Sequence, residues 1–533
     1  MSDDFLDDEV AAVTFERGDD SVAVVVGSGA GGGTLANELA QKGIDVVVIE
    51  AGPRFKDTDF ENDEWEMYDR LTWKDKRAAT GTSPVAQNFS EAPTWLCKGV
   101  GGSTLHWAAM CPRFQPHEFK TRSTYGDISG ATIADWPIDF AEIEPYYVRA
   151  EDRMGVSGRN GIPFHGGNNN YKVMALGAKR MGYTDFDTNN LAINVEPRHG
   201  RNACDQIGFC MQGCRSGAKW STFNTELPQA EATGRCEIRP ECMALRVEHD
   251  QAGRVSGILY VDRDGNEHVQ KARVVCIAGN SIETPRLLLN SESSLHPDGL
   301  ANASGLVGKN YMRHMFGFVY AEFDKPVNMN RGVVVGGILR DEVGHDESRG
   351  FVGGYYSGTI GLGLPFYAAF LNPKGWGRDY TDWVGAFDRI AGLQILGEDM
   401  AMDTNQVSLH PTDKDQYGLP IPTLHLDDHP NEIRMKNYAY RKTVALMEAA
   451  GAVRVFESPP LPASHNMGTC RMADDAQAGV VNQWGQSHEI PNLFISDGSQ
   501  FASSMAGNPT LTIVALAIRQ AEYIAEKMRG NEI

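Results

Sequence analysis

Three cysteines stand close together near the middle of the chain. Cys204, Cys210 and Cys214 fall within eleven residues and have the spacing C-x5-C-x3-C. Three thiolates can hold a three-iron cluster or three corners of a larger one. Zinc is disfavoured, because there is no C-x2-C pair, no fourth cysteine nearby, and His199 lies upstream across a charged loop. A structural loop with free thiols or one disulfide is the remaining alternative.

A glycine-rich turn near the start of the chain predicts a dinucleotide site. Gly27, Gly29 and Gly32 form a G-x-G-x-x-G pattern. The first glycine permits a tight turn, the second lets the backbone approach a pyrophosphate, and the third lets helix and strand pack closely. Glu50, 18 residues past Gly32, is placed to accept hydrogen bonds from a ribose. A strand, a helix and a second strand are expected around this turn, at residues 21–26, 34–41 and 45–49.

Gly101 and Gly102, followed by Ser103 and Thr104, predict a second turn of this kind. Its N–H groups could face a flavin or a phosphate. The alternative is a loop that enters a helix, with one of the two hydroxyl groups as the cap.

Two further segments combine a strand with a turn and a helix. In residues 273–289 a strand leads to Gly279 and then to a helix with Pro285 in its first position. Near the C-terminus a strand ends at Asp497-Gly498, and an apolar helix follows with Asn508 as its N-cap and Pro509 in its first position.

The composition narrows the function classes. The chain has 49 Lys and Arg against 70 Asp and Glu, a net charge of −21, which disfavours nucleic-acid binding. The 41% of hydrophobic residues indicates a globular protein, and no run reaches the 18 apolar residues of a membrane helix. The acidic stretch 57–66 is expected to be a solvated surface loop. The first nine residues lack the basic and apolar regions of a signal peptide.

In this order and spacing, the segments resemble the glucose–methanol–choline (GMC) oxidoreductase family of flavoenzymes. The residues that carry the resemblance are the Gly27 turn with Glu50-Ala-Gly-Pro53, Gly101-Gly102-Ser-Thr, Ala278-Gly279 with Glu283-Thr284-Pro285, Val307-Gly308-Lys-Asn310, His465-Asn-Met-Gly-Thr-Cys-Arg-Met472, Asp497-Gly498-Ser and Asn508-Pro-Thr-Leu-Thr512. One position departs from the family pattern. Trp107 stands where the family often has Asn, and this variant is similar to the bacterial sugar and polyol dehydrogenase branch.

The resemblance implies bound FAD and a base. FAD would lie on Gly27, Gly29 and Gly32 with its ribose at Glu50, and Asp497-Gly498 would lie near its other end. Gly101, Gly102 and Ser103 would contact the flavin. His465 matches the family's catalytic histidine, and Asn508 matches its partner position. His106 and His314 are expected to be structural.

The cysteine spacing is similar to the [3Fe-4S] segment of that same branch. A one-electron centre is useful only if electrons leave singly, so we expect a dehydrogenase of a sugar, sugar acid, polyol or glycoside. The alternatives are an alcohol oxidase that reduces O₂ and has structural cysteines, and an electron carrier, which would have no need of His465 and Asn508.

The branch also implies partners and a location. Its catalytic subunit works with a small subunit that carries an export signal and with a cytochrome acceptor. We therefore expect a periplasmic protein exported through a partner, with the cytoplasm as the alternative. No direct membrane span and no nucleic-acid partner are expected.

The expected fold is α/β, α+β overall, with two interleaved domains. A Rossmann-like FAD domain comprises residues 15–310 and 461–533, with an iron–sulfur loop inserted at about 200–220. Residues 311–460 form a substrate domain built on an antiparallel sheet.

Overall fold

The computed structural model describes residues 13–533, so the acidic N-terminal segment lies outside the described residues. A five-stranded parallel sheet has the order β17-β9-β1-β2-β5. Its strands come from distant parts of the chain: β17 (Leu493–Ile495), β9 (Val274–Ile277), β1 (Ala23–Val26), β2 (Val46–Ile49) and β5 (Cys236–Arg239). The sequence of β1 is Ala-Val-Val-Val, and every residue is buried, as expected for a strand covered on both faces.

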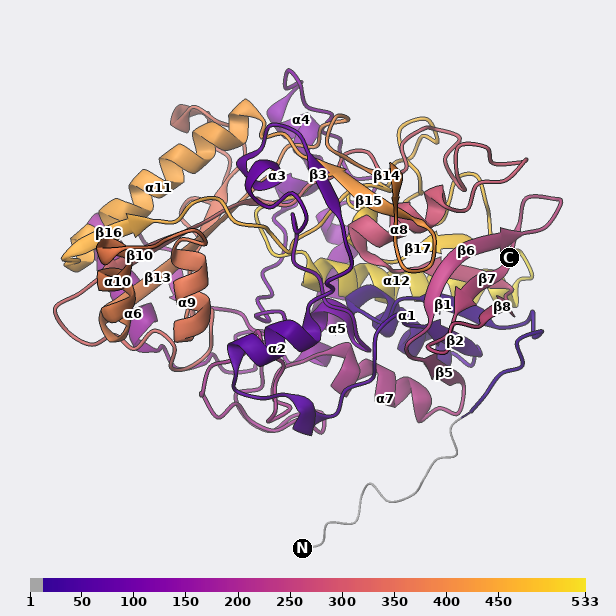
Figure 1. The fold of residues 1–533 in the computed structure, drawn as a ribbon, viewed down its shortest axis with the longest axis horizontal. Coiled ribbons are helices and arrows are strands. Elements are labelled where there is room, and N and C mark those ends of the chain that lie inside the picture. The colour runs from indigo at the N-terminus through magenta and orange to yellow at the C-terminus, as the bar shows by residue number, and fades with distance from the viewer. Residues whose placement is uncertain (1–12) are drawn as a thin grey trace, which may run out of the picture.

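Helices from both ends of the chain pack together beside this sheet. Helix α1 (Ala30–Gln41) contacts α12 (Thr510–Arg529), and α12 also contacts α5 (Phe140–Met154). Figure 1 shows α1 and α12 side by side next to β1 and β17. The apolar face of α12 and Val25 of β1 share one core with α1. The last helix therefore completes the domain that the first strand begins.

A six-stranded antiparallel sheet forms the other side of the molecule (Figure 1). Its order is β16 (Arg454–Glu457), β10 (Met315–Glu322), β13 (Ile390–Gly397), β12 (Tyr355–Thr359), β11 (Gly337–Leu339) and β4 (Phe186–Thr188). Helices α6 (Asn169–Met181) and α11 (Pro430–Ala450) cover one face of it, where they pack on Val319 and Leu393. The parallel and antiparallel sheets confirm the predicted fold class.

Smaller elements connect and cover these sheets. Strands β6 (Met243–His249), β7 (Val255–Val261) and β8 (Glu267–Lys271) form one antiparallel sheet. Strands β14 (Gln406–Lys414), β15 (Pro420–His425) and β3 (Ala78–Thr80) form a mixed sheet, in which β14 and β15 are antiparallel and β15 and β3 are parallel. The remaining α-helices are α2 (Glu64–Leu71), α3 (Pro84–Asn88), α4 (Thr121–Tyr125), α7 (Glu226–Glu231), α8 (Asn280–Leu289), α9 (Leu364–Leu371) and α10 (Arg378–Gly385). No helix within residues 13–533 is long and apolar enough to cross a membrane.

Two local predictions are wrong for tertiary reasons. Pro285 lies inside α8, which begins at Asn280. Proline cannot donate to the carbonyl four residues earlier, and Thr469 Oγ1 donates to that Ser281 carbonyl instead, at 3.0 Å. The acidic stretch 57–66 is not wholly solvated, because Glu64 is buried and accepts hydrogen bonds from the N–H groups of Gly363 and Phe366.

Candidate active site

A cavity of about 820 Å³ opens at the carboxyl ends of β1, β2, β9 and β17. Ligands of parallel α/β sheets bind at this edge. All four predicted glycine turns contribute to its lining, and so do His465 and Asn508. The chain therefore brings together segments from residue 26 to residue 513 around one space.

The three glycines of the first turn have different surroundings. Gly27 has a φ of +94°, and a Cβ there would lie 2.5 Å from the Ala278 carbonyl oxygen. A Cβ on Gly32 would lie 2.0 Å from the Gly27 carbonyl oxygen. Gly29 differs, because its nearest neighbour would be the Cα of Gly102 at 3.8 Å. Gly27 and Gly32 are thus required by packing, whereas Gly29 leaves open space on the cavity side.

Glu50 closes the end of β2 and joins it to the first turn. Its Oε2 accepts hydrogen bonds from the N–H of Ser28 (3.0 Å) and from Ser28 Oγ (2.7 Å), and its Oε1 accepts from the N–H of Gly52 (2.9 Å). Burial raises the pKa of this carboxyl above its usual value. Lining the cavity, it is placed to accept further hydrogen bonds from a ligand.

The second glycine turn packs directly on the first. Gly101 has a φ of +107° and donates its N–H to Ser28 Oγ at 2.9 Å. A Cβ on Gly102 would lie 2.8 Å from the Cα of Gly29. Gly102 and Ser103 line the cavity, and the Ser103 hydroxyl accepts a hydrogen bond from the N–H of Cys97. Trp107 also lines it, with its indole N–H bound to the carbonyl of Trp220 at 3.0 Å.

Asp497 holds the turn before α8 against the turn after β17. Its Oδ2 accepts hydrogen bonds from the N–H of Asn280 (2.8 Å) and from Thr284 Oγ1 (2.6 Å). Its Oδ1 accepts from the N–H of Ser499 (2.8 Å). Burial raises the pKa of this carboxyl. Asp497 and Gly498 both line the cavity.

His465 and Asn508 contact each other at the cavity wall. Asn508 Nδ2 donates to His465 Nε2 at 3.2 Å, while the buried Asn508 Oδ1 has no partner among the described residues. The predicted capping role of Asn508 is wrong, because Pro509 occupies the N-cap of α12 and no side chain caps this helix. The amide bonds the histidine instead.

His314 completes this group on the side away from Asn508. Its Nδ1 lies 3.0 Å from His465 Nδ1, and its Nε2 lies 3.3 Å from the carbonyl oxygen of Ser504. Burial lowers the pKa of His314 to about 4 and holds the pKa of His465 well below its usual value. Both rings are therefore neutral near pH 7. The expectation that His314 is structural does not include its contact with His465. The only feature of the sequence that could have indicated this contact is the place of His314 just before β10.

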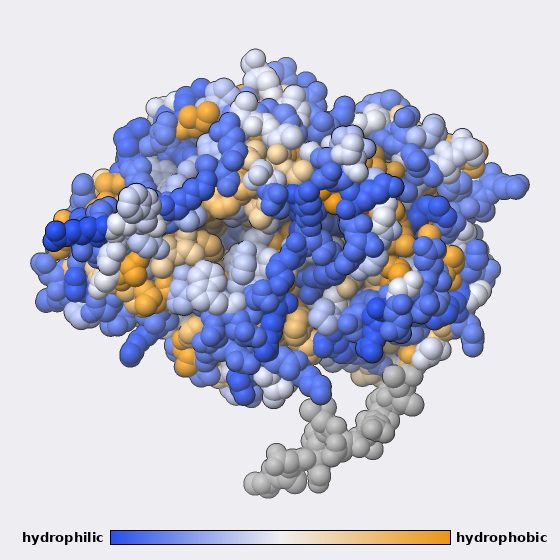
Figure 2. All heavy atoms as spheres, viewed as in Figure 1, coloured by the Kyte–Doolittle hydropathy of each residue, from blue (hydrophilic) through white to orange (hydrophobic). Residues whose placement is uncertain are grey.

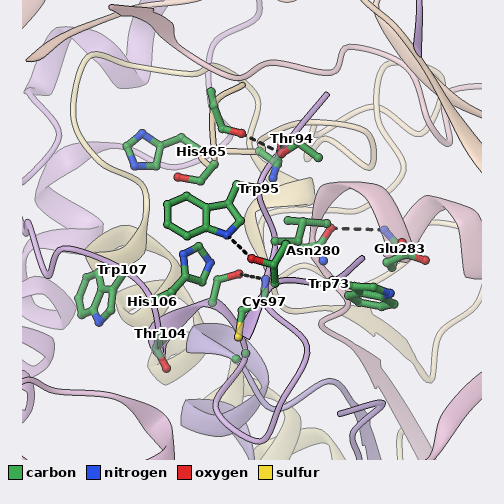
Figure 3. A pocket seen from close by; sticks show the side chains of 18 of the residues that line it. Trp73, Thr94, Trp95, Cys97, Thr104, His106, Trp107, Asn280, Glu283 and His465 are labelled. Carbon is green, nitrogen blue, oxygen red and sulfur yellow. Dashed lines mark hydrogen bonds between the residues drawn. The ribbon is translucent and has the colours of Figure 1, made fainter. Parts of the chain in front are cut away.

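His106 lies on the opposite side of Trp95 from His465 in Figure 3. The His106 and Trp95 rings have centroids 4.6 Å apart. Burial lowers the pKa of His106 to about 3, and its Nε2 has no partner in the described chain. His106 is thus a neutral ring packed in the cavity wall.

The cysteine loop lies between the cavity and the surface. Gln206, Gly208, Phe209 and Gly213 have positive φ values, which bend the loop back on itself. Met211, between two of the cysteines, lines the cavity, and Ile207 on the same loop is 45% exposed.

Two of the three thiols accept hydrogen bonds, and none forms a disulfide. Cys204 Sγ accepts from the N–H of Gln206 at 3.4 Å, and Cys214 Sγ accepts from the N–H of Lys219 at 3.3 Å. All three, including Cys210, are free. Across the described residues, the cysteine sulfurs do not form a set within 4.8 Å of one another, the spacing that ligands of a single ion would have.

Two buried cations lie beside these thiols. Lys219 is 2% exposed and donates to the carbonyl oxygens of Leu105 and Trp107 (both 2.9 Å) and of Cys210. Arg201 is 4% exposed and donates to the carbonyls of Ala218 and Met154. Within the described chain neither forms an ion pair with a carboxylate, and burial lowers the pKa of Lys219 to about 8. Buried cations need a counter-charge, and the nearby sulfurs could supply it only as thiolates. Sequence reasoning missed both residues, although they flank the cysteines.

Known proteins that resemble this chain belong to one family of oxidoreductases. Family models described as GMC oxidoreductase match residues 11–316 and 402–517. The chain is 32% identical to a 2-methyl-1,2-propanediol dehydrogenase of Mycolicibacterium austroafricanum, over 96% of each chain. It is 27% identical to the fructose dehydrogenase large subunit of Gluconobacter japonicus, over 95% of this chain and 98% of the relative. Among solved structures, a formate oxidase of Aspergillus oryzae shares the fold, with a TM-score of 0.69 at 16% identity over 97% of this chain and all of that one.

Proposed function

The chain belongs to the GMC oxidoreductase family and is an oxidoreductase of CH–OH groups, and from this premise we propose that it is an FAD-dependent dehydrogenase with an iron–sulfur cluster. One observation carries the proposal. A single cavity has a neutral histidine in its wall and a loop with three cysteines at its border. The reaction would convert an alcohol to a carbonyl compound.

The residues around the cavity fit FAD. Gly29 leaves room for a pyrophosphate, and Glu50 offers a carboxylate for a ribose. Gly102 and Ser103 would face the flavin, with Gly101 behind them against Ser28, and Asp497 with Gly498 would hold the far end of the site. When bound, FAD accepts a hydride from the carbon that carries the hydroxyl group.

Side chains of this protein would accept the proton of the substrate hydroxyl group and stabilise the oxygen that loses it. His465 Nε2 carries a lone pair and would take the hydroxyl proton as the hydride leaves the carbon. Asn508 lies against the same nitrogen and would hydrogen-bond the substrate oxygen, which stabilises the developing negative charge. His314 holds the other edge of the His465 ring. Trp95 and His106 help to exclude water from this end of the cavity.

We also propose that Cys204, Cys210 and Cys214 hold a [3Fe-4S] cluster. Amide N–H groups that donate to cluster sulfurs are a feature of such sites, and Cys204 and Cys214 each accept one. Lys219 and Arg201 would balance the negative charge of three thiolates. The position of the loop, with Met211 at the cavity and Ile207 at the surface, suits an outward path for single electrons.

An outward path for single electrons requires a partner protein that accepts them. A dehydrogenase of this kind would pass electrons to a cytochrome, and the relative from Gluconobacter is described as a large subunit. We propose a small signal-bearing subunit as the second partner, and a periplasmic location reached through it. Residues 15–310 with 461–533 would form the FAD domain, with residues 311–460 as the substrate domain.

Absorption and iron analysis of the purified protein test the proposal. We expect about three iron atoms per chain, a broad absorption beneath the flavin bands, and bleaching of the flavin by an alcohol without oxygen. In a Cys210→Ser variant, the alcohol should still bleach the flavin absorption. This variant should not reduce a cytochrome acceptor. Clean flavin bands with release of hydrogen peroxide would instead establish the alternative, an alcohol oxidase with structural cysteines.

A further inference from the structure

The part of the cavity beyond His465 is almost wholly apolar. Among the residues that the segment 311–460 contributes to the lining, only Gln394 has a polar side chain. The others are aromatic or aliphatic, and Phe316, Phe318, Ile360 and Phe370 are among them. This composition differs from what a sugar requires.

The sheet register explains why these side chains meet. Phe318 on β10 lies opposite Gln394 on β13, so both point to the same face of the six-stranded sheet. Phe316, two residues earlier, points to that face as well. The neighbouring residues Val319 and Leu393 point to the opposite face, under α6 and α11. One face of the sheet therefore serves as core, and the other serves as the cavity wall.

Aromatic rings continue from this wall to the surface. The Phe318 and Phe370 rings are stacked with centroids 6.1 Å apart and an interplanar angle of 17°. Phe370 contacts Phe366, which contacts Trp95 at 5.8 Å and Trp65 at 6.1 Å. Trp65 is 54% exposed. Figure 2 shows apolar residues, in pale orange, in a hollow on this face between hydrophilic margins.

The aromatic wall is held in place by a buried acid. The Glu64 carboxylate, on α2, accepts the N–H groups of Gly363 and Phe366 (both 2.8 Å) at the start of α9. This capping fixes α2, which carries Trp65, against α9, which carries Phe366 and Phe370. The apolar surface is therefore a built feature of the cavity.

Few polar groups near the base are free to bind a substrate. Asn466 lines the cavity, but its Oδ1 already accepts a hydrogen bond from Thr94 Oγ1 at 3.0 Å. Within the described residues, the one hydrogen bond of the Gln394 side chain is the long one that its Nε2 donates to Met110 Sδ at 3.9 Å. The wall from residues 311–460 thus offers one free amide, and beside the base the Asn466 Nδ2 and the Ser464 hydroxyl add two polar groups without a hydrogen-bond partner in the described chain.

We propose that the substrate is an apolar alcohol, aliphatic or aromatic, with at most one further polar group, and not a sugar. This inference rests on the proposed function and replaces the sugar or polyol expected from the resemblance. His465 and Asn508 take the reacting hydroxyl group, the aromatic wall packs on the body of the molecule, and Gln394 binds a second oxygen if one is present. A sugar would bring several hydroxyl groups against a wall from residues 311–460 whose only polar side chain is Gln394, and each buried hydroxyl group without a partner is unfavourable.

A substrate panel with an artificial one-electron dye, read without oxygen, tests this. We expect kcat/KM to rise about tenfold or more from 1-propanol to 1-hexanol, as apolar pockets reward added methylene groups. Benzyl alcohol should match 1-hexanol, and glucose, gluconate and sorbitol should be about 100-fold poorer. A sugar or polyol that exceeds both apolar alcohols would overturn the inference and leave the proposed function standing. If no compound reduces the flavin, both fail.

Variants in the wall give a second measurement. Phe318→Leu should lower the ratio of kcat/KM for benzyl alcohol over 1-propanol about tenfold, with FAD content unchanged. If Phe318→Leu folds poorly, Phe370→Leu on α9 takes its place in the experiment. It should lower the same ratio. Phe456→Leu, on β16 and away from the cavity, is the matched control and should leave the ratio unchanged. An unchanged ratio in both wall variants would contradict the proposal.

Discussion

His314 and His465 face each other through their Nδ1 atoms, 3.0 Å apart. Only one of the two can carry the shared proton. Because the Ser504 carbonyl can only accept, the proton of neutral His314 belongs on Nε2, and His314 Nδ1 accepts from His465 Nδ1–H. His465 Nε2 then carries a lone pair toward Asn508 and the cavity. His314 is thus a positioning residue for the proposed base.

Removal of this acceptor should impair proton transfer. We expect His314→Phe to lower kcat by roughly 10²-fold, the lower end of what a positioned base contributes, with little change in KM. His314→Asn can still accept a hydrogen bond through its side-chain oxygen and should recover part of the loss. Equal losses in both variants, with normal FAD content, would mean that His314 only fills space.

The lowered pKa of His465 predicts a pH profile. Burial and the neighbouring His314 favour the neutral ring, so His465 stays a competent base below pH 6.5. Activity is lost when the base takes up a proton, and the acid limb of kcat/KM should therefore lie below pH 6.5. A limb at or above pH 6.5, measured with a substrate that does not titrate, would contradict this assignment.

Two neighbouring glycines should respond differently to alanine. A Cβ on Gly31 would lie 1.6 Å from the Ser496 carbonyl oxygen, so we expect Gly31→Ala to destabilise the fold severely, by more than about 4 kcal/mol. Gly29→Ala has no such clash inside the protein and should fold. Its methyl group occupies cavity space near the proposed pyrophosphate, so FAD content should fall at least tenfold. Thermal unfolding and bound flavin, measured on both variants, separate these outcomes.

The features that could be predicted from the sequence are those decided by residues close together in the chain. The unit from β1 to β2 follows from β-branched strands, the positive φ of Gly27 and the close approach of Gly32 to the Gly27 carbonyl, which are all local. His314 could not be found in this way, because it lies 151 residues from His465 and meets it only in the folded chain. The cap rule for Asn508 failed for a similar reason, since a distant histidine took the amide. The apolar cavity wall needed the register between β10 and β13, which no single strand reveals.

The buried cation beside the cysteines should tune the proposed cluster. We expect Lys219→Met to lower the reduction potential of the iron centre or to reduce iron content, because one compensating positive charge is lost. Flavin reduction by substrate should stay within about twofold of the parent, because Lys219 does not line the cavity. Lys271→Met, on β8 and exposed, is the matched control. An unchanged potential with full iron content would contradict the charge-balance argument.

Two buried carboxyl groups should make the fold less stable as the pH rises. Glu118 and Glu398 each have an oxygen within 4.8 Å of the other, and neither forms an ion pair with a cation in the described chain. Burial and the neighbouring Glu398 raise the pKa of Glu118 to about 8, and burial raises the pKa of Glu398 to about 7. In the unfolded chain both release protons near pH 4.3. Between these values the folded state binds more protons, so the free energy of unfolding falls as pH rises.

The fall should continue through the pKa of Glu118, about 8, and level off only about one pH unit above it, where both groups are ionised in the folded state as well. Thermal unfolding from pH 5 to pH 8.5, with EDTA in all samples, measures it as a falling Tm. Glu118→Gln removes one ionisation and should flatten the slope, because the remaining Glu398 no longer faces a second carboxyl group. Glu267→Gln, an exposed carboxyl on β8, should keep the parent slope. A Tm that rises over this range in the parent, or an equal slope in both variants, would show that this pair does not control the stability.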